Sequence, residues 1–160
     1  MRRLHVGYIG MDRSSREGLI TLVDPTSNML LVITLEFRDI LSMINELQTT
    51  GTSLSDGFSL IRNLVTAFHG TLTRLVIDAC NDGIFASRLL MEHRSSHLVF
   101  DVQIVYAVTL ALRLGIPIFV EDSVWSAHAI RAEELRDVGR FEEDEQLTQW
   151  LDGLSPEDFT

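Results

Sequence analysis

The stretch LTRLVIDAC at residues 72–80, followed by NDG at residues 81–83 and IFASRLLM at residues 84–91, decides the fold. Two apolar segments rich in β-forming residues flank an Asp-Gly pair, and glycine accepts the positive φ that a tight turn requires. The pattern therefore predicts a β-hairpin with Asp82 in its turn. A second polar turn follows, so residues 97–101 are expected to add a further antiparallel strand.

The segments on the N-terminal side of this hairpin predict three more strands and two helices. Residues 5–11, 18–23 and 29–34 are apolar, and polar turns separate them. Apolar residues then recur at helical spacing in residues 36–47 and again in residues 58–68. We therefore expect three antiparallel strands followed by two amphipathic helices.

The segments on the C-terminal side predict a third helix and a buried strand. The helix covers residues 103–114 and ends at a glycine, and residues 117–120 form a short apolar strand. A short helix is expected after Asp122, and a terminal helix is expected over residues 140–151.

Taken in order, these elements predict an α+β fold with a mostly antiparallel or mixed sheet and three main helices. Residues 1–130 are expected to form a single compact domain, and residues 131–160 an acidic C-terminal tail that is partly helical. The charge distribution supports this division. Residues 133–160 hold ten of the 23 acidic residues and two of the 13 basic ones, so the remaining body is nearly neutral.

Composition excludes several function classes. Every basic residue is an arginine, so Schiff-base chemistry on lysine and a phosphate loop ending in Lys are both excluded. No apolar run reaches the ~20 residues that a membrane helix needs, and we expect no membrane partner. Cys80 is the only cysteine, which rules out an intrachain disulfide and favours a reducing, cytoplasmic setting.

Three aspartates are the candidates for acid chemistry, and each also has a structural interpretation. Asp82 suits a tight turn, and Asp101 can cap the helix that follows it. Asp78 alternates with Val76 and Cys80 along a strand, where an acid is less common unless the strand lies at a sheet edge.

Several of these segments resemble the bacterial bifunctional nuclease family, also called the BFN or DNase-RNase domain. LVI at residues 75–77 and DGIFA at residues 82–86 are similar to the family's strand, Asp-Gly turn and aromatic strand. AVTLALRLGIPIFV at residues 107–120 looks like its Ala/Leu-rich helix and Pro-led strand. LDGLSPEDF at residues 151–159 resembles the C-terminus of actinobacterial members.

The resemblance implies a nuclease that cleaves DNA and RNA and assembles as a homodimer. Nuclease chemistry normally uses carboxylates that hold Mg²⁺ or Mn²⁺, which activates water and stabilises charge at phosphorus. On this interpretation Asp82 and Asp101 are catalytic, Asp78, Asp82 and Asp101 hold the metal, and Arg113 contacts phosphate.

One departure from the family pattern keeps a second hypothesis open. Residues 103–106 read QIVY, where family members carry an Arg-Pro-Ser-Asp run. The chain is therefore either a metal-dependent phosphodiesterase or a catalytically degenerate member that acts as a binding or dimeric assembly module. In the second case Ile104 and Tyr106 predict an apolar surface such as a dimer interface.

Overall fold

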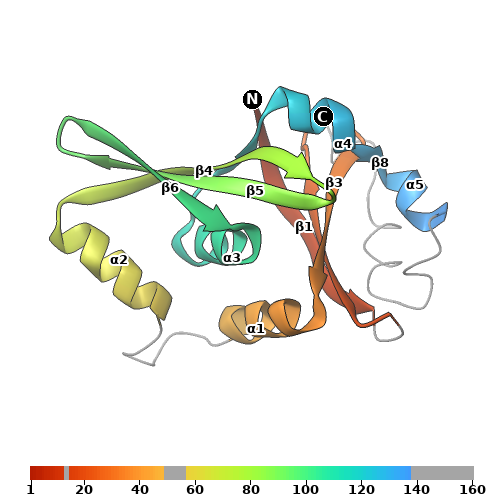
Figure 1. The fold of residues 1–160 in the computed structure, drawn as a ribbon, viewed down its shortest axis with the longest axis horizontal. Coiled ribbons are helices and arrows are strands. Elements are labelled where there is room, and N and C mark those ends of the chain that lie inside the picture. The colour runs from red at the N-terminus through yellow and green to blue at the C-terminus, as the bar shows by residue number, and fades with distance from the viewer. Residues whose placement is uncertain (13–14, 49–56, 138–160) are drawn as a thin grey trace.

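The computed structural model describes residues 1–12, 15–48 and 57–137 (Figure 1). Eight strands in this part of the chain form one sheet in the order β6-β5-β4-β7-β1-β2-β3-β8. The strands are β1 (Arg2–Asp12), β2 (Glu17–Val23), β3 (Met29–Glu36), β4 (Gly70–Asn81), β5 (Ile84–His93), β6 (Ser96–Gln103), β7 (Ile118–Val120) and β8 (Ile130–Arg131). The helices are α1 (Phe37–Gln48), α2 (Gly57–Ala67), α3 (Ile104–Leu114), α4 (Asp122–His128) and α5 (Ala132–Asp137).

The predicted hairpin is confirmed as β4 and β5. These strands pair antiparallel from Gly70 opposite His93 to Asn81 opposite Ile84. Asp82 and Gly83 form the turn with φ values of 51° and 78°. Both central residues of a type I′ turn require positive φ, and Asp-Gly is a pair that adopts this conformation, which explains why the pair predicted the turn. The strand that follows, β6, pairs antiparallel with β5 as expected.

The short strand β7 joins two antiparallel groups of strands into one mixed sheet. It pairs parallel with β4 through Leu75 and Ile118, and antiparallel with β1 through Leu4 and Ile118. Among the described residues, the strands β1 to β3 are therefore joined to the strands β4 to β6 through the three residues of β7.

The main core lies between the sheet and the helices α1 and α3, which pack against each other on one face (Figure 1). Helix α3 buries seven of its eleven residues, among them Ala107, Val108 and Ala111. Helix α1 buries Ile40 and Met43. It also lies so close to β2 that a Cβ atom on Gly18 would come within 2.3 Å of the Ile40 Cβ. A glycine in that strand position is thus required by close packing.

The expectation of three main helices was wrong, because five helices occur in the described part of the chain. The additional helices are α4 and α5. Helix α4 buries Val124 and Trp125 in the main core. Helix α5 begins in the segment assigned to the acidic extension, where Ala132 and Leu135 lie three residues apart and bury one face against Leu19 and Leu30. This pair of apolar residues is hard to identify in the sequence, because Glu133 and Glu134 lie between them.

The acidic tail and its predicted helix at residues 140–151 fall outside the described residues. Within them, no helix combines the length and apolar character needed to cross a bilayer.

Candidate functional site

One face of the sheet carries a continuous row of side chains across five strands, and Arg3, Arg88 and Asp101 are among them. Leu75 and Leu89 are opposite each other and point into the core beneath α3. The neighbouring residues point the other way, because side chains alternate along a strand. On that other face Arg3 lies opposite Phe119, Phe119 opposite Val76, Val76 opposite Arg88, and Arg88 opposite Asp101. We call this surface the outer sheet face. It consists of the residues of this row together with Arg74 and Asp78 of β4: Arg3, Arg74, Val76, Asp78, Arg88, Asp101 and Phe119.

Arg88 is held at the centre of this face by Asp78. The register of β4 against β5 shifts between Ile77 and Ala79, so Asp78 occupies a bulge. A bulge re-aims a side chain, and here the Asp78 Oδ2 lies 2.6 Å from the Arg88 Nε. The Asp78 side chain is 18% exposed and the Arg88 side chain 45% exposed. The other carboxylate oxygen of Asp78, Oδ1, is buried with no hydrogen-bond partner among the described residues.

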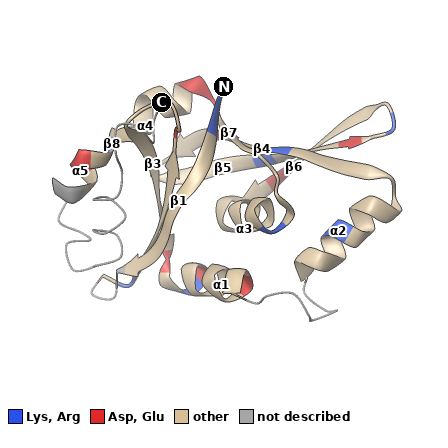
Figure 2. Cartoon of the chain, turned by 180° about the vertical axis from the view of Figure 1, so that it is seen from behind, with Lys and Arg blue, Asp and Glu red and all other residues tan. Residues whose placement is uncertain are grey.

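Two more arginines and an aromatic ring extend the outer sheet face toward β1. The Arg74 guanidinium lies 5.9 Å from the centre of the Phe119 ring, within the range of a cation–π contact. Arg3 is exposed beside Phe119 on the next strand. Figure 2 shows basic positions on β1 and in the central β4–β5 region of the same sheet. Arginine beside an aromatic ring suits contact with both phosphate and base.

The structure brings together two of the three predicted aspartates. Asp78 and Asp101 lie on the strands that flank β5, one bonded to Arg88 and the other opposite it. Asp82 is exposed in the β4–β5 turn, beyond the paired residues. Arg113 lies on α3, against the other face of the sheet, where its Nη1 donates to the Glu46 carbonyl oxygen at 3.3 Å.

The alternative role of Asp101 as a helix cap does not apply. Asp101 belongs to β6, and Gln103 stands at the N-cap of α3 without a side-chain hydrogen bond to the helix. The carboxylate therefore remains on the exposed sheet surface next to Arg88.

The three predicted aspartates do not fit a shared metal ion. No group of three or more His, Cys, Asp or Glu side chains in the described ranges is arranged to hold one. A guanidinium already lies against Asp78 and faces Asp101, so the positive charge between these acids comes from the chain itself.

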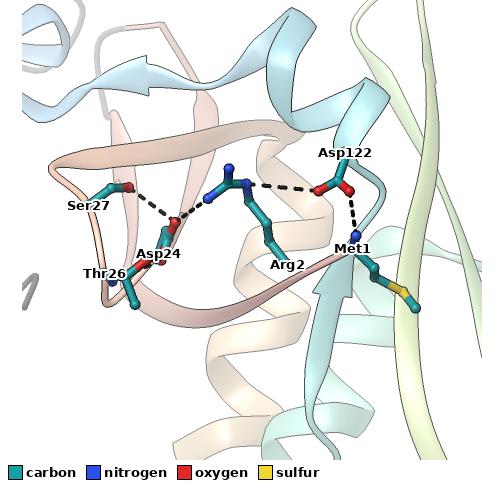
Figure 3. Close-up of polar contacts among 6 residues, drawn as sticks. All are labelled: Met1, Arg2, Asp24, Thr26, Ser27 and Asp122. Atoms are coloured by element: carbon teal, nitrogen blue, oxygen red, sulfur yellow. Dashed lines mark hydrogen bonds and ion pairs between the residues drawn. The ribbon is translucent and has the colours of Figure 1, made fainter.

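A second polar cluster, shown in Figure 3, surrounds Asp24 at the end of β2. Asp24 is 3% exposed. Its Oδ1 accepts hydrogen bonds from the Thr26 backbone N–H at 2.8 Å and the Thr26 hydroxyl at 2.7 Å. Its Oδ2 accepts from Ser27 at 3.1 Å and from the Arg2 Nη1 at 3.0 Å. Burial alone would raise the pKa of Asp24, but these hydrogen bonds outweigh it and hold the pKa below 3.8.

The same cluster connects β1 to α4. The terminal ammonium of Met1 lies 2.6 Å from the Asp122 Oδ2, and this hydrogen bond is the main reason that the pKa of Asp122 is lowered. The Arg2 guanidinium lies 5.5 Å from the centre of the Trp125 ring. The sequence indicated only a turn at Asp24, although an aspartate two residues before a threonine is the pattern of an Asx turn. We assign this cluster a structural role, because both oxygens of its buried acid, Asp24, accept hydrogen bonds from partners within the chain.

Comparison with known proteins places these features in a family. The sequence profile of the bifunctional nuclease domain matches residues 20–133. Two curated relatives come from Mycobacterium tuberculosis, one from strain CDC 1551 / Oshkosh and one from strain ATCC 25618 / H37Rv. Each bears the name uncharacterized protein and is 30% identical over 105 residues. The match covers 62% of this chain and 62% of the length of each relative.

Proposed function

Because the chain belongs to the bifunctional nuclease family, we propose that it binds nucleic acid on the outer sheet face and hydrolyses phosphodiester bonds there. The observation that supports this proposal best is the position of Arg88 between Asp78 and Asp101 on an exposed surface. Arg74 over Phe119 provides a second contact point on the neighbouring strands.

Each residue has a distinct role in the proposed reaction. Phosphodiester hydrolysis needs a base for the attacking water and a positive group near the phosphate oxygens. Asp101 is exposed and takes the proton of the water, while solvent protonates the leaving oxygen. Arg88 stabilises the charge on the phosphate through its terminal amino groups, since its Nε is held by Asp78. Asp78 is therefore a positioning residue.

The test is cleavage of single- and double-stranded DNA and RNA by the wild-type chain and by two variants. Asp101→Asn removes the base and keeps the size of the side chain, and Arg88→Ala removes the positive charge. We expect each to lower the cleavage rate by roughly 10²-fold or more. Each assay is run with Mg²⁺, with Mn²⁺ and with a chelator, since the family resemblance implies one of these cations.

Glu92→Gln is the matched control, because Glu92 is an exposed acid on the same face of β5 and pairs with His97 across the next strand. It should leave cleavage unchanged. Cleavage that survives both Asp101→Asn and Arg88→Ala would reject this site while leaving the family assignment intact.

A catalytically degenerate binding module is the second candidate function. It is favoured by Asp78, whose carboxylate is paired with Arg88, because only Asp101 of the two aspartates beside Arg88 then remains to act as a base. Salt-dependent binding of nucleic acid without cleavage under all three conditions would support this second function.

We also propose that the chain assembles as a homodimer. Large apolar side chains are exposed on α2, directly after it and on β6, among them Leu64, Phe68 and Val99. The expectation that Ile104 contributes to such a surface was wrong, since it is 7% exposed and packs in the core. Tyr106 is 55% exposed and remains available.

A further inference from the structure

The two edges of the sheet differ in length and protection. At one edge β8 has two residues and leads directly into α5. At the other edge β6 has eight residues, and in the described part of the chain it pairs only with β5. Its central residues Leu98, Val99 and Phe100 are 38%, 53% and 45% exposed. A long exposed apolar edge strand is a template for pairing with another chain.

We infer that β6 pairs antiparallel with β6 of a second copy, with Val99 of one copy opposite Val99 of the other. This inference rests on the homodimer proposed above and names its contact surface. In this register a two-fold axis passes through the Val99 pair, as a symmetric dimer requires.

Polar side chains meet polar ones and apolar side chains meet apolar ones in this register. His97 of each copy lies opposite Asp101 of the other, and Leu98 lies opposite Phe100. Residues 97, 99 and 101 share the face of Arg88 and Leu90, whereas residues 98 and 100 share the face of Leu89 and Met91. Directly opposite residues of an antiparallel pair share a face. The imidazole–carboxylate pairs therefore form on the outer sheet face, and the apolar pairs form on the helix-covered face.

The neighbouring symmetric registers match less well. An axis through Phe100 places Asp101 opposite Val99, and an axis through Leu98 places His97 opposite Val99. Both oppose a charged or polar group to an apolar one, and neither pairs His97 with Asp101. Because polar side chains that can hydrogen-bond across strands stabilise a pair, the register centred on Val99 is favoured.

Helix α2 lies on the same side of the sheet as part of this contact. Val65 of α2 lies near Gly70 and Met91, and Met91 pairs with Leu98. Helix α2 therefore packs on the same face as the apolar pairs across the new contact. The outer sheet faces of the two copies become one continuous surface, which doubles the number of arginines that a single nucleic acid meets.

Cysteine crosslinking tests the register, with Cys80→Ala as the background in every variant. Val99→Cys brings two sulfur atoms together at the axis, since opposite Cα atoms lie about 4.5–5.5 Å apart, within disulfide range. We expect rapid formation of a crosslinked dimer on mild oxidation. Ser96→Cys is the matched control, because the two cysteines lie roughly 20 Å apart along the strands and should not crosslink.

The oligomeric state is then measured by light scattering for the wild-type chain and for Val99→Lys. The substitution places two like charges opposite each other at the axis, and we expect the dimer dissociation constant to rise about tenfold or more. A dimer that Val99→Lys leaves unchanged, or that Ser96→Cys crosslinks as fast as Val99→Cys, would overturn the β6 contact but keep the homodimer. A wild-type chain that stays monomeric at micromolar concentration would overturn both.

Discussion

Helices α1 and α2 look alike in the sequence and differ in the fold. Both are amphipathic and of similar length, with 12 and 11 residues. Helix α1 buries Ile40 and Met43 against the sheet and α3, whereas no residue of α2 is buried. An apolar stripe in the sequence therefore identifies the apolar face of a helix. It does not show whether another element of the same chain buries that face.

The largest expected difference is between one isoleucine on each helix, Ile40 on α1 and Ile61 on α2. Ile40→Ala removes a side chain that is 0% exposed, and should lower the free energy of unfolding by about 2–5 kcal/mol. Ile61 is 40% exposed, and Ile61→Ala should cost less than about 0.5 kcal/mol in dilute monomer. Urea unfolding of the two variants measures both values. Equal losses would show that α2 is as firmly packed as α1.

A smaller loss of stability is expected when the buried polar cluster around Asp24 is changed. Asp24→Asn removes a buried carboxylate and weakens its bond to Arg2, which should cost about 1–3 kcal/mol. The folded pKa of Asp24 is below its ordinary value of 3.8. The stability that the carboxylate contributes is therefore fully present above about pH 4 and is lost as the pH falls through the lower folded value.

Urea unfolding from pH 6 downward checks this dependence. The loss caused by Asp24→Asn should shrink in acid, as the wild-type chain loses the same contribution. Asp122→Asn is the control, since Asp122 has a side chain that is 69% exposed and should change stability little. A cost of Asp24→Asn that stays constant to the lowest pH would show that its charge does not matter.

The ion pair on the outer sheet face should contribute less than the buried cluster. Arg88 and Asp78 are both partly exposed, and a double-mutant cycle with Arg88→Ala and Asp78→Ala should give a coupling of about 1 kcal/mol. A coupling of zero would mean that Asp78 does not hold Arg88 in place. In that case its assignment as a positioning residue fails.

The smallest effect is expected for Arg74→Ala on nucleic-acid binding. Loss of one phosphate contact should weaken binding severalfold and reduce the slope of log affinity against log salt by about one. Fluorescence anisotropy with a labelled oligonucleotide over a range of salt concentrations measures the slope. Arg62→Ala on α2 is the control, because this exposed arginine lies on another element; an equal change there would indicate nonspecific attraction.

The local elements were predictable because their signals lie within a few residues. The Asp82-Gly83 turn, the apolar spacing of α1 and the glycine that ends α3 all follow from short-range patterns. Other features depend on partners distant in the sequence. The shift of register at Asp78, which aims its carboxylate at Arg88, is set by the pairing of two strands and leaves no mark in the sequence. Likewise, Asp101 looked like a helix cap until the length of β6 was known.

The three residues of β7 also determine the order in which the domain can be completed. Strands β1 to β3 and strands β4 to β6 each need only neighbouring segments, so both groups can form from local contacts. Their union requires Ile118 to meet Leu4, more than a hundred residues earlier in the chain. Such distant contacts close slowly because of the entropy of the intervening loop. Docking of β7 is therefore expected to be the late, rate-limiting step of folding, and a chain that stops before residue 118 should retain two sheets that never join.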